Sequence, residues 1–167
     1  MSRALALKGI LHRSPREIGA IAVKHFKGNF RRQGFDGTKW AARKKEARKS
    51  SGRAILIRSA RLRNSIRVVR ADLRGIVIGT DVPYARIHNE GGTINQPSRS
   101  EIFKRNRYVK GRKKGMFARG VSAGRGFTYK QRVIRIPKRQ FIGESKELTT
   151  LVDTWYKKNV GQALKSK

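Results

Sequence analysis

Residues 66–92 read IRVVRADLRGIVIGTDVPYARIHNEGG, and this stretch contains the patterns of both strand and helix. Two runs rich in β-branched residues flank the turn-forming residues 72–75, which predicts a hairpin of two strands. Pro83 then opens a short helix, and Gly91-Gly92 ends it because glycine adopts a positive φ without steric cost. The stretch therefore predicts a fold that mixes an antiparallel hairpin with helices.

Helices are also expected near both ends of the chain. Residues 14–33 begin with Ser14-Pro15-Arg16-Glu17, where a capping serine, a first-turn proline and a capping-box glutamate coincide. Residues 144–160 show a second amphipathic pattern, and Ser145 can cap that helix. Its expected buried stripe consists of Leu148, Leu151, Val152 and Trp155.

The predicted fold class is α+β: a small antiparallel β-sheet packed against the N-terminal and C-terminal amphipathic helices, with a long basic loop or hairpin arm. The chain length of 167 residues fits a single domain, 1–167. Between the two helices we expect an extended basic arm at 34–53, a β-rich core at 54–97, a basic glycine-rich loop at 98–131 and a strand at 132–137.

The charge balance is the unusual feature of the composition. Lys and Arg number 42 against 10 acidic residues, which gives a formal net charge of +32. Like-charge repulsion on this scale opposes compaction, so the chain is expected to seek a polyanion or an acidic protein. Nucleic acid is the first candidate, and binding to it would weaken strongly with salt.

Several classes of protein are disfavoured by what the sequence lacks. Without cysteine there is no disulfide scaffold, thiolate metal site or cysteine nucleophile. No window approaches the roughly 18 apolar residues of a membrane span, so we expect a soluble, unprocessed protein with no membrane partner.

The glycine-rich loop at 98–131 carries the strongest physicochemical signal. Its side chains could contact phosphates or dock onto an acidic protein, and the sequence leaves both readings open. The candidate contact residues are the cations Arg99, Lys104, Arg105, Arg107, Lys110, Arg112, Lys113, Lys114, Arg119 and Arg125.

We expect no catalytic residues, no metal ligands and no cofactor. His88-Asn89-Glu90 superficially resembles part of an HNH-type nuclease, but no paired His/Asp cluster accompanies it. The alternative interpretation is structural: His88 and Glu90 help to hold the turn at Gly91-Gly92. A small nuclease or hydrolase stays the least favoured hypothesis.

Four segments occur in an order that resembles a known family. They are FDGTKW at 35–40, ILIRSARLRNSI at 55–66, IGTDVPYARIHNEGG at 78–92 and IPKRQFIG at 136–143. Together they resemble the tail-completion or virion morphogenesis proteins of tailed phages, over roughly residues 16–158. The positions that carry the resemblance are Trp40, Leu62, Tyr84, Ala85, His88, Gly91, Gly92, Pro137, Arg139, Phe141 and Gly143.

The resemblance implies a non-enzymatic virion protein at the neck or tail top, assembled in the cytoplasm of the bacterial host. It implies a homo-oligomeric ring, of about six or twelve copies if it follows the symmetry of tails and connectors. Expected partners are the connector or adaptor, the tail terminator or tail tube proteins, and genomic DNA in the lumen. A basic nucleic-acid-binding protein without catalysis is the alternative function.

Overall fold

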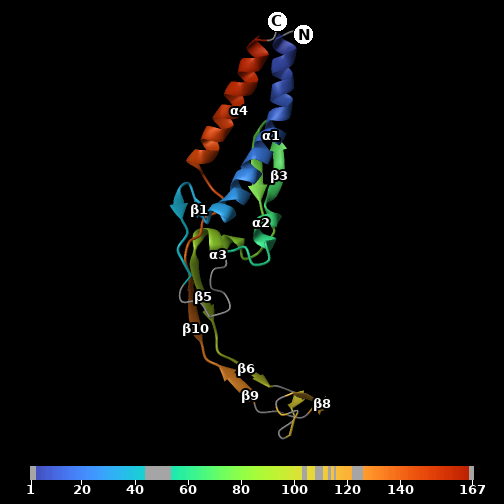
Figure 1. Ribbon diagram of the computed structural model, residues 1–167, viewed down its shortest axis with the longest axis vertical. Coiled ribbons are helices and arrows are strands. Elements are labelled where there is room, and N and C mark those ends of the chain that lie inside the picture. The colour runs from blue at the N-terminus through green and yellow to red at the C-terminus, as the bar shows by residue number, and fades with distance from the viewer. Residues whose placement is uncertain are drawn as a thin grey trace. The chain divides into compact units, whose positions relative to one another are not determined.

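The computed structural model describes residues 3–43, 54–102, 105–107, 111–112, 114, 116–121 and 126–165 (Figure 1). It contains four helices and small antiparallel sheets of two strands each, so the predicted α+β class is confirmed. Contacts group the chain into two compact units, one made of Met1–Gly92 with Pro137–Lys167 and the other of Thr93–Ile136. The expectation that 1–167 form a single domain stays a prediction.

The first helix, α1, spans Arg3–Arg32 and so begins well before the expected start at residue 14. Pro15 lies inside α1 and has no N–H to donate to the carbonyl of Leu11, four residues earlier. The hydroxyl of Ser14 donates to that carbonyl instead, at 3.0 Å. The Ser-Pro pair that predicts a helix start is therefore accommodated in the helix interior.

The core of the first unit forms around the second half of α1. Phe30 is fully buried, and its ring meets Trp40 edge-on at 5.5 Å and Phe141 at 5.2 Å between centroids. The other buried apolar residues of this cluster are Ala22, Phe26, Leu62, Ile66, Val82 and Ala85. Leu62 belongs to the short helix α2, Arg61–Ser65, and Ala85 to α3, Ala85–Glu90.

The predicted hairpin is present as β3, Arg67–Asp72, paired antiparallel with β4, Gly75–Gly79. The carboxylate of Asp72 accepts the amides of Arg74 and Gly75 at 2.8 and 3.0 Å, which fixes the turn. The hairpin packs on α1, where Gly19 permits a close approach: a Cβ at this position would lie 3.0 Å from Val68. A second small hairpin, β1 at Gly34–Phe35 with β2 at Thr38–Lys39, occupies part of the expected arm at 34–53.

The last helix, α4, spans Lys146–Lys165 and packs along α1 (Figure 1). Ser145 caps it as predicted, since its hydroxyl oxygen accepts the amide of Leu148 at 3.1 Å. The expected burial of Leu151 is wrong, because this side chain is 45% exposed. No helix among the described residues is long and apolar enough to cross a membrane.

The second unit is a series of paired strands, which we call the basic hairpin (residues 93–136). β5 at Gly92–Gln96 pairs with β10 at Arg132–Ile136, and β6 at Arg99–Ile102 pairs antiparallel with β9 at Gly126–Tyr129. β7 at Arg105–Arg107 pairs antiparallel with β8 at Phe117–Val121. Of the two expected forms, loop or hairpin arm, the described residues between 98 and 131 take the hairpin form.

Candidate functional site

The ten predicted contact cations all fall within the basic hairpin. Arg99 lies on β6, and Arg112 and Lys114 lie in an exposed turn. Arg105 and Arg107 belong to β7, and Arg119 belongs to β8. The remaining four, Lys104, Lys110, Lys113 and Arg125, lie outside the described residues.

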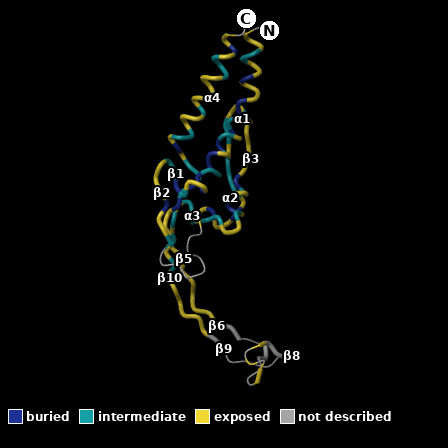
Figure 2. Tube along the Cα trace, in the orientation of Figure 1, coloured by how far each residue is buried: buried dark blue, intermediate teal, exposed yellow. Residues whose placement is uncertain are grey.

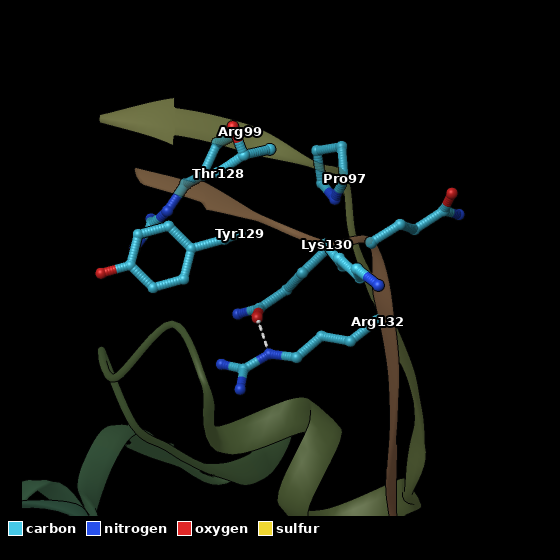
Figure 3. Close-up of a pocket in the computed structure, with 8 residues that line it drawn as sticks. Pro97, Arg99, Thr128, Tyr129, Lys130 and Arg132 are labelled. Atoms are coloured by element: carbon cyan, nitrogen blue, oxygen red, sulfur yellow. Dashed lines mark hydrogen bonds between the residues drawn. The ribbon is translucent and has the colours of Figure 1, made fainter. Parts of the chain in front are cut away.

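An open hollow of about 730 Å³ lies beside β6 and β9 and contains cations from both sides of the hairpin (Figure 3). Arg99, Lys130 and Arg132 line it together with Gln96, Thr128 and Tyr129. The guanidinium of Arg99 stacks over the ring of Tyr129 at 4.9 Å, and Nε of Arg132 donates to Oε1 of Gln96 at 2.5 Å. Lys130 lies near the end of the expected loop at 98–131 and Arg132 lies just after it, but neither was among the predicted contacts.

The resemblance-carrying residues converge on the first unit, where segment 136–143 closes over the end of α1. The indole N–H of Trp40 donates to the carbonyl of Gln140 at 2.7 Å. Arg139 is 8% exposed, its backbone amide donates to the carbonyl of His88 at 2.8 Å, and its guanidinium donates to the carbonyl of Ala41 at 3.1 Å. These residues hold the fold together, which agrees with a structural interpretation of the motif.

Asparagine and glutamine side chains that were not predicted from the sequence also hold the backbone segments around the end of α1 in place. Oδ1 of Asn89 accepts the amides of Phe141 and Ile142 at 2.9 and 3.1 Å. Asn29 is fully buried in α1 and donates to the carbonyl of Phe141 at 3.2 Å. Gln33 bonds both the amide and the carbonyl of Ile55. The one sequence signal for these residues is the position of Asn29 beside the apolar residues Phe26 and Phe30 of the first helix, which indicates a buried polar side chain.

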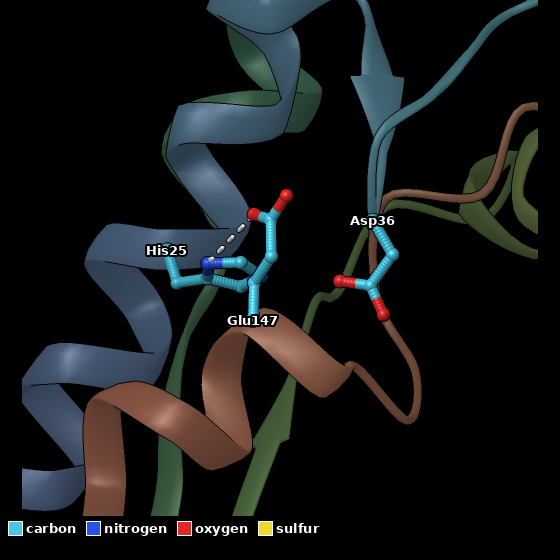
Figure 4. A group of neighbouring side chains, drawn as sticks. All are labelled: His25, Asp36 and Glu147. Atoms are coloured by element: carbon cyan, nitrogen blue, oxygen red, sulfur yellow. Dashed lines mark ion pairs between the residues drawn. The ribbon is translucent and has the colours of Figure 1, made fainter. Parts of the chain in front are cut away.

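A polar network joins α1, the β1–β2 turn and the start of α4, where His25, Asp36 and Glu147 face one another (Figure 4). His25 is buried, and its Nε2 lies 3.0 Å from the hydroxyl of Ser145, which donates to Asp36. Asp36 also accepts the amide of Lys146 at 2.7 Å. The network therefore fixes the first turn of α4 against α1.

The cation beside this cluster is an arginine of the chain itself. Nη1 of Arg32 lies 3.0 Å from Oε2 of Glu147, and its Nη2 lies 3.4 Å from Nδ1 of His25. A neutral imidazole fits the two hydrogen-bond contacts, with Nδ1 accepting from Arg32 and Nε2–H donating to Ser145. Nδ1 also lies 4.0 Å from Oε2 of Glu147, a contact that forms an ion pair only when His25 is protonated. His25, Asp36 and Glu147 have the residue types of a metal site, but the guanidinium already supplies the positive charge there.

Burial lowers the pKa of His25 below its usual value, the nearby Arg32 lowers it further, and Glu147 and Asp36 oppose both effects. Burial would raise the pKa of Asp36, but hydrogen bonds from Ser145 and from the amides of Lys146 and Glu147 outweigh it and lower that pKa. Both shifts favour the neutral histidine and the ionised aspartate in the folded protein.

The nuclease hypothesis gains no support from the geometry around His88. Burial and the neighbouring Arg139 lower the pKa of His88, and its carbonyl is engaged by Arg139. Glu90 pairs with Arg86 at 3.0 Å along α3. Among the described residues, neither His88 nor Glu90 belongs to a group of three potential metal ligands.

Sequence comparison agrees with this structural interpretation. A profile described as the phage virion morphogenesis family matches residues 1–160. The chain belongs to this family. No curated protein and no solved structure matches the chain. Membership in the phage virion morphogenesis family makes the protein a phage structural or morphogenesis component, and it suggests a non-enzymatic role.

Replacing Asn89 with alanine should destabilise the first unit by about 2 kcal/mol or more. Two amides lose their acceptor, and an unsatisfied buried donor costs about 1–3 kcal/mol. Urea unfolding followed by tryptophan fluorescence measures the change. The matched control is Asn95→Ala on the exposed strand β5, which should change stability by less than about 0.5 kcal/mol. Equal stability of the two variants would contradict the closure described above.

Stability should fall as the pH drops below about 6.5, the usual pKa of histidine. Because the folded-state pKa values of His25 and His88 are lowered, the unfolded chain binds protons that the folded chain rejects. The contribution of these groups is complete above the unfolded pKa and is lost below it.

The measurement is the urea midpoint between about pH 7.5 and pH 5. His25→Gln should flatten this pH dependence in part, because His88 still contributes. His12→Gln, at an exposed position of the same helix, should keep the wild-type dependence. An unchanged slope in His25→Gln would show that His25 titrates alike in the folded and unfolded chains.

Proposed function

We propose that this member of the phage virion morphogenesis family completes the tail or joins it to the head, as a ring of identical copies around the particle axis. The ring would number about six or twelve copies, to match the symmetry of its neighbours. Its partners would be the connector or adaptor on one side and the tail terminator or tail tube protein on the other. It would be assembled in the host cytoplasm and reside in the neck of the virion.

The observation that carries this proposal is an uncovered hairpin in the first unit. β3 and β4 form a sheet of only two strands, so both outer edges lack a partner strand among the described residues. Val69 is 64% exposed and Val77 is 43% exposed, and Leu73 at the turn is 70% exposed. An open edge with exposed apolar side chains is suited to pairing with another chain.

Repetition of that contact would build a ring. A neighbour that covers β3 and β4 with a different part of its surface forms a heterologous contact, and such contacts close into a ring when the rotation permits. The net charge of +32 opposes this assembly, since every copy repels the next. The proposed ring is therefore expected to form together with acidic or anionic partners.

Purified virions washed in high salt should contain the protein at a fixed copy number that is a small multiple of six. A structural neck protein resists the wash because it is locked between other components, whereas a protein attracted only by charge is released. Quantitative mass spectrometry of the washed particles measures the number. Absence of the chain from them would favour the alternative, a basic nucleic-acid-binding protein outside the particle.

Val69→Asp should abolish self-association while leaving the monomer folded. Val69 is exposed in the single chain, so the substitution is tolerated there, but burying a carboxylate in the subunit contact is costly. Mass photometry of the purified protein, alone and with its particle partners, gives the size distribution. Leu5→Asp, at a 58% exposed leucine of α1 and outside both hairpins, is the matched control and should assemble as wild type. Normal rings from Val69→Asp would exclude this hairpin as the contact.

A further inference from the structure

The formal positive charge per residue is higher in the basic hairpin than in the rest of the chain. Residues 93–136 contain thirteen Lys and Arg residues and one acid, Glu101, for a formal charge of +12. The other 123 residues carry a formal charge of +20, so the charge per residue is about 1.7 times higher in the hairpin. The cations of this segment therefore cannot be neutralised by acids of the same segment.

The described residues of this segment form no hydrophobic core of their own. None of their side chains is buried, and only those of Ile134 and Ile136 are half-buried. The paired strands β5 and β10 are largely exposed (Figure 2). Isolated two-stranded ribbons are marginally stable in water, so a ribbon of this kind is expected to gain order from a partner. With thirteen cations against one acid in the segment, this partner has to supply negative charge.

The described cations are already positioned for anionic oxygen atoms. Arg99 is held by stacking on Tyr129, and Arg132 is held by its bond to Gln96, which reduces the conformational entropy that binding would cost. Lys130 lies between them at the edge of the same hollow (Figure 3). Guanidinium groups bind phosphates through two parallel hydrogen bonds, and lysine contributes a point charge.

We propose that the basic hairpin binds duplex DNA through its backbone phosphates, without reading the base sequence. Protein interfaces have an apolar centre and are depleted in lysine, whereas the hollow beside β6 and β9 is lined mostly by polar and cationic side chains, Lys130 among them. A surface of cations with one acid in the segment suits a regular row of phosphates. The inference rests on the proposed function only for the source of the DNA, which would be the phage genome.

The test uses the full-length protein and a short duplex of random sequence, with the dissociation constant measured by fluorescence anisotropy over a range of salt concentrations. The variant is the triple change Arg99→Gln, Lys130→Gln and Arg132→Gln. Each phosphate contact contributes about 0.9 to the slope of log affinity against log salt, so the slope should become shallower by about 2 to 3. Binding at low salt should weaken by at least about tenfold.

The matched control removes the same charges from exposed positions of α1, through Arg16→Gln, Lys24→Gln and Arg31→Gln. It should keep the wild-type slope. An equal loss in both triple variants, or no DNA binding by the wild type, would overturn the inference. Polyglutamate that binds as tightly as DNA, and is lost in the hairpin variant alone, would assign the surface to an acidic protein instead.

The outcome for DNA binding is separable from the proposed function. A hairpin variant that loses DNA binding yet enters particles at the wild-type copy number supports the site and leaves the ring intact. Wild-type protein that occupies the neck but does not bind DNA would overturn this inference alone. Protein that binds DNA through the hairpin but is absent from particles would overturn the proposed function alone.

Discussion

The core of the first unit depends on the contact between Phe30 and Phe141, because it joins α1 to the segment that precedes α4. Closing a loop of this length costs conformational entropy, and the cost grows slowly with length. The buried aromatic pair offsets it, and Asn29 and Asn89 fix the backbone of residues 141–142 so that the ring of Phe141 stays in the core. Once segment 136–143 is held there, Ser145 lies where it can cap α4 and meet His25.

Local signals in the sequence were sufficient for the elements whose stability is local. The β3–β4 hairpin follows from β-branched runs around Asp72, and the start of α4 follows from Ser145 as a cap. The predicted start of α1 was wrong because Ser14-Pro15 is compatible both with a helix start and with a position inside a helix. In the structure the pair lies inside α1, where the hydroxyl of Ser14 donates to the carbonyl of Leu11. The exposure of Leu151 could not be predicted from the sequence either. The apolar stripe of α4 shows which face packs against a neighbour, but it does not show how much of that face the neighbour covers.

The residues of the candidate sites also fall into those that the local sequence predicted and those that depend on long-range contacts. The composition of residues 98–131 located the basic hairpin, but Arg132 lies beyond that range and joins the hollow because β10 continues the ribbon. The long-range bonds of Asn89 and Gln33 had no local signal, because each connects positions far apart in the chain. The residues that carry the family resemblance lie mainly in and around the core of the first unit, so they predict the fold rather than a contact with a partner.

The distribution of acids explains why the excess charge has to be met from outside. Asp36 is satisfied by Ser145 and the first turn of α4, and Asp72 holds the β3–β4 turn. Four further acids pair with cations of the first unit: Glu17 with Arg13, Asp81 with Arg67, Glu90 with Arg86 and Glu147 with Arg32. Acids used in this way stabilise the first unit locally, whereas residues 93–136 contain thirteen cations and one acid, Glu101. The proposed ring would therefore need an anionic partner to offset the repulsion between its copies.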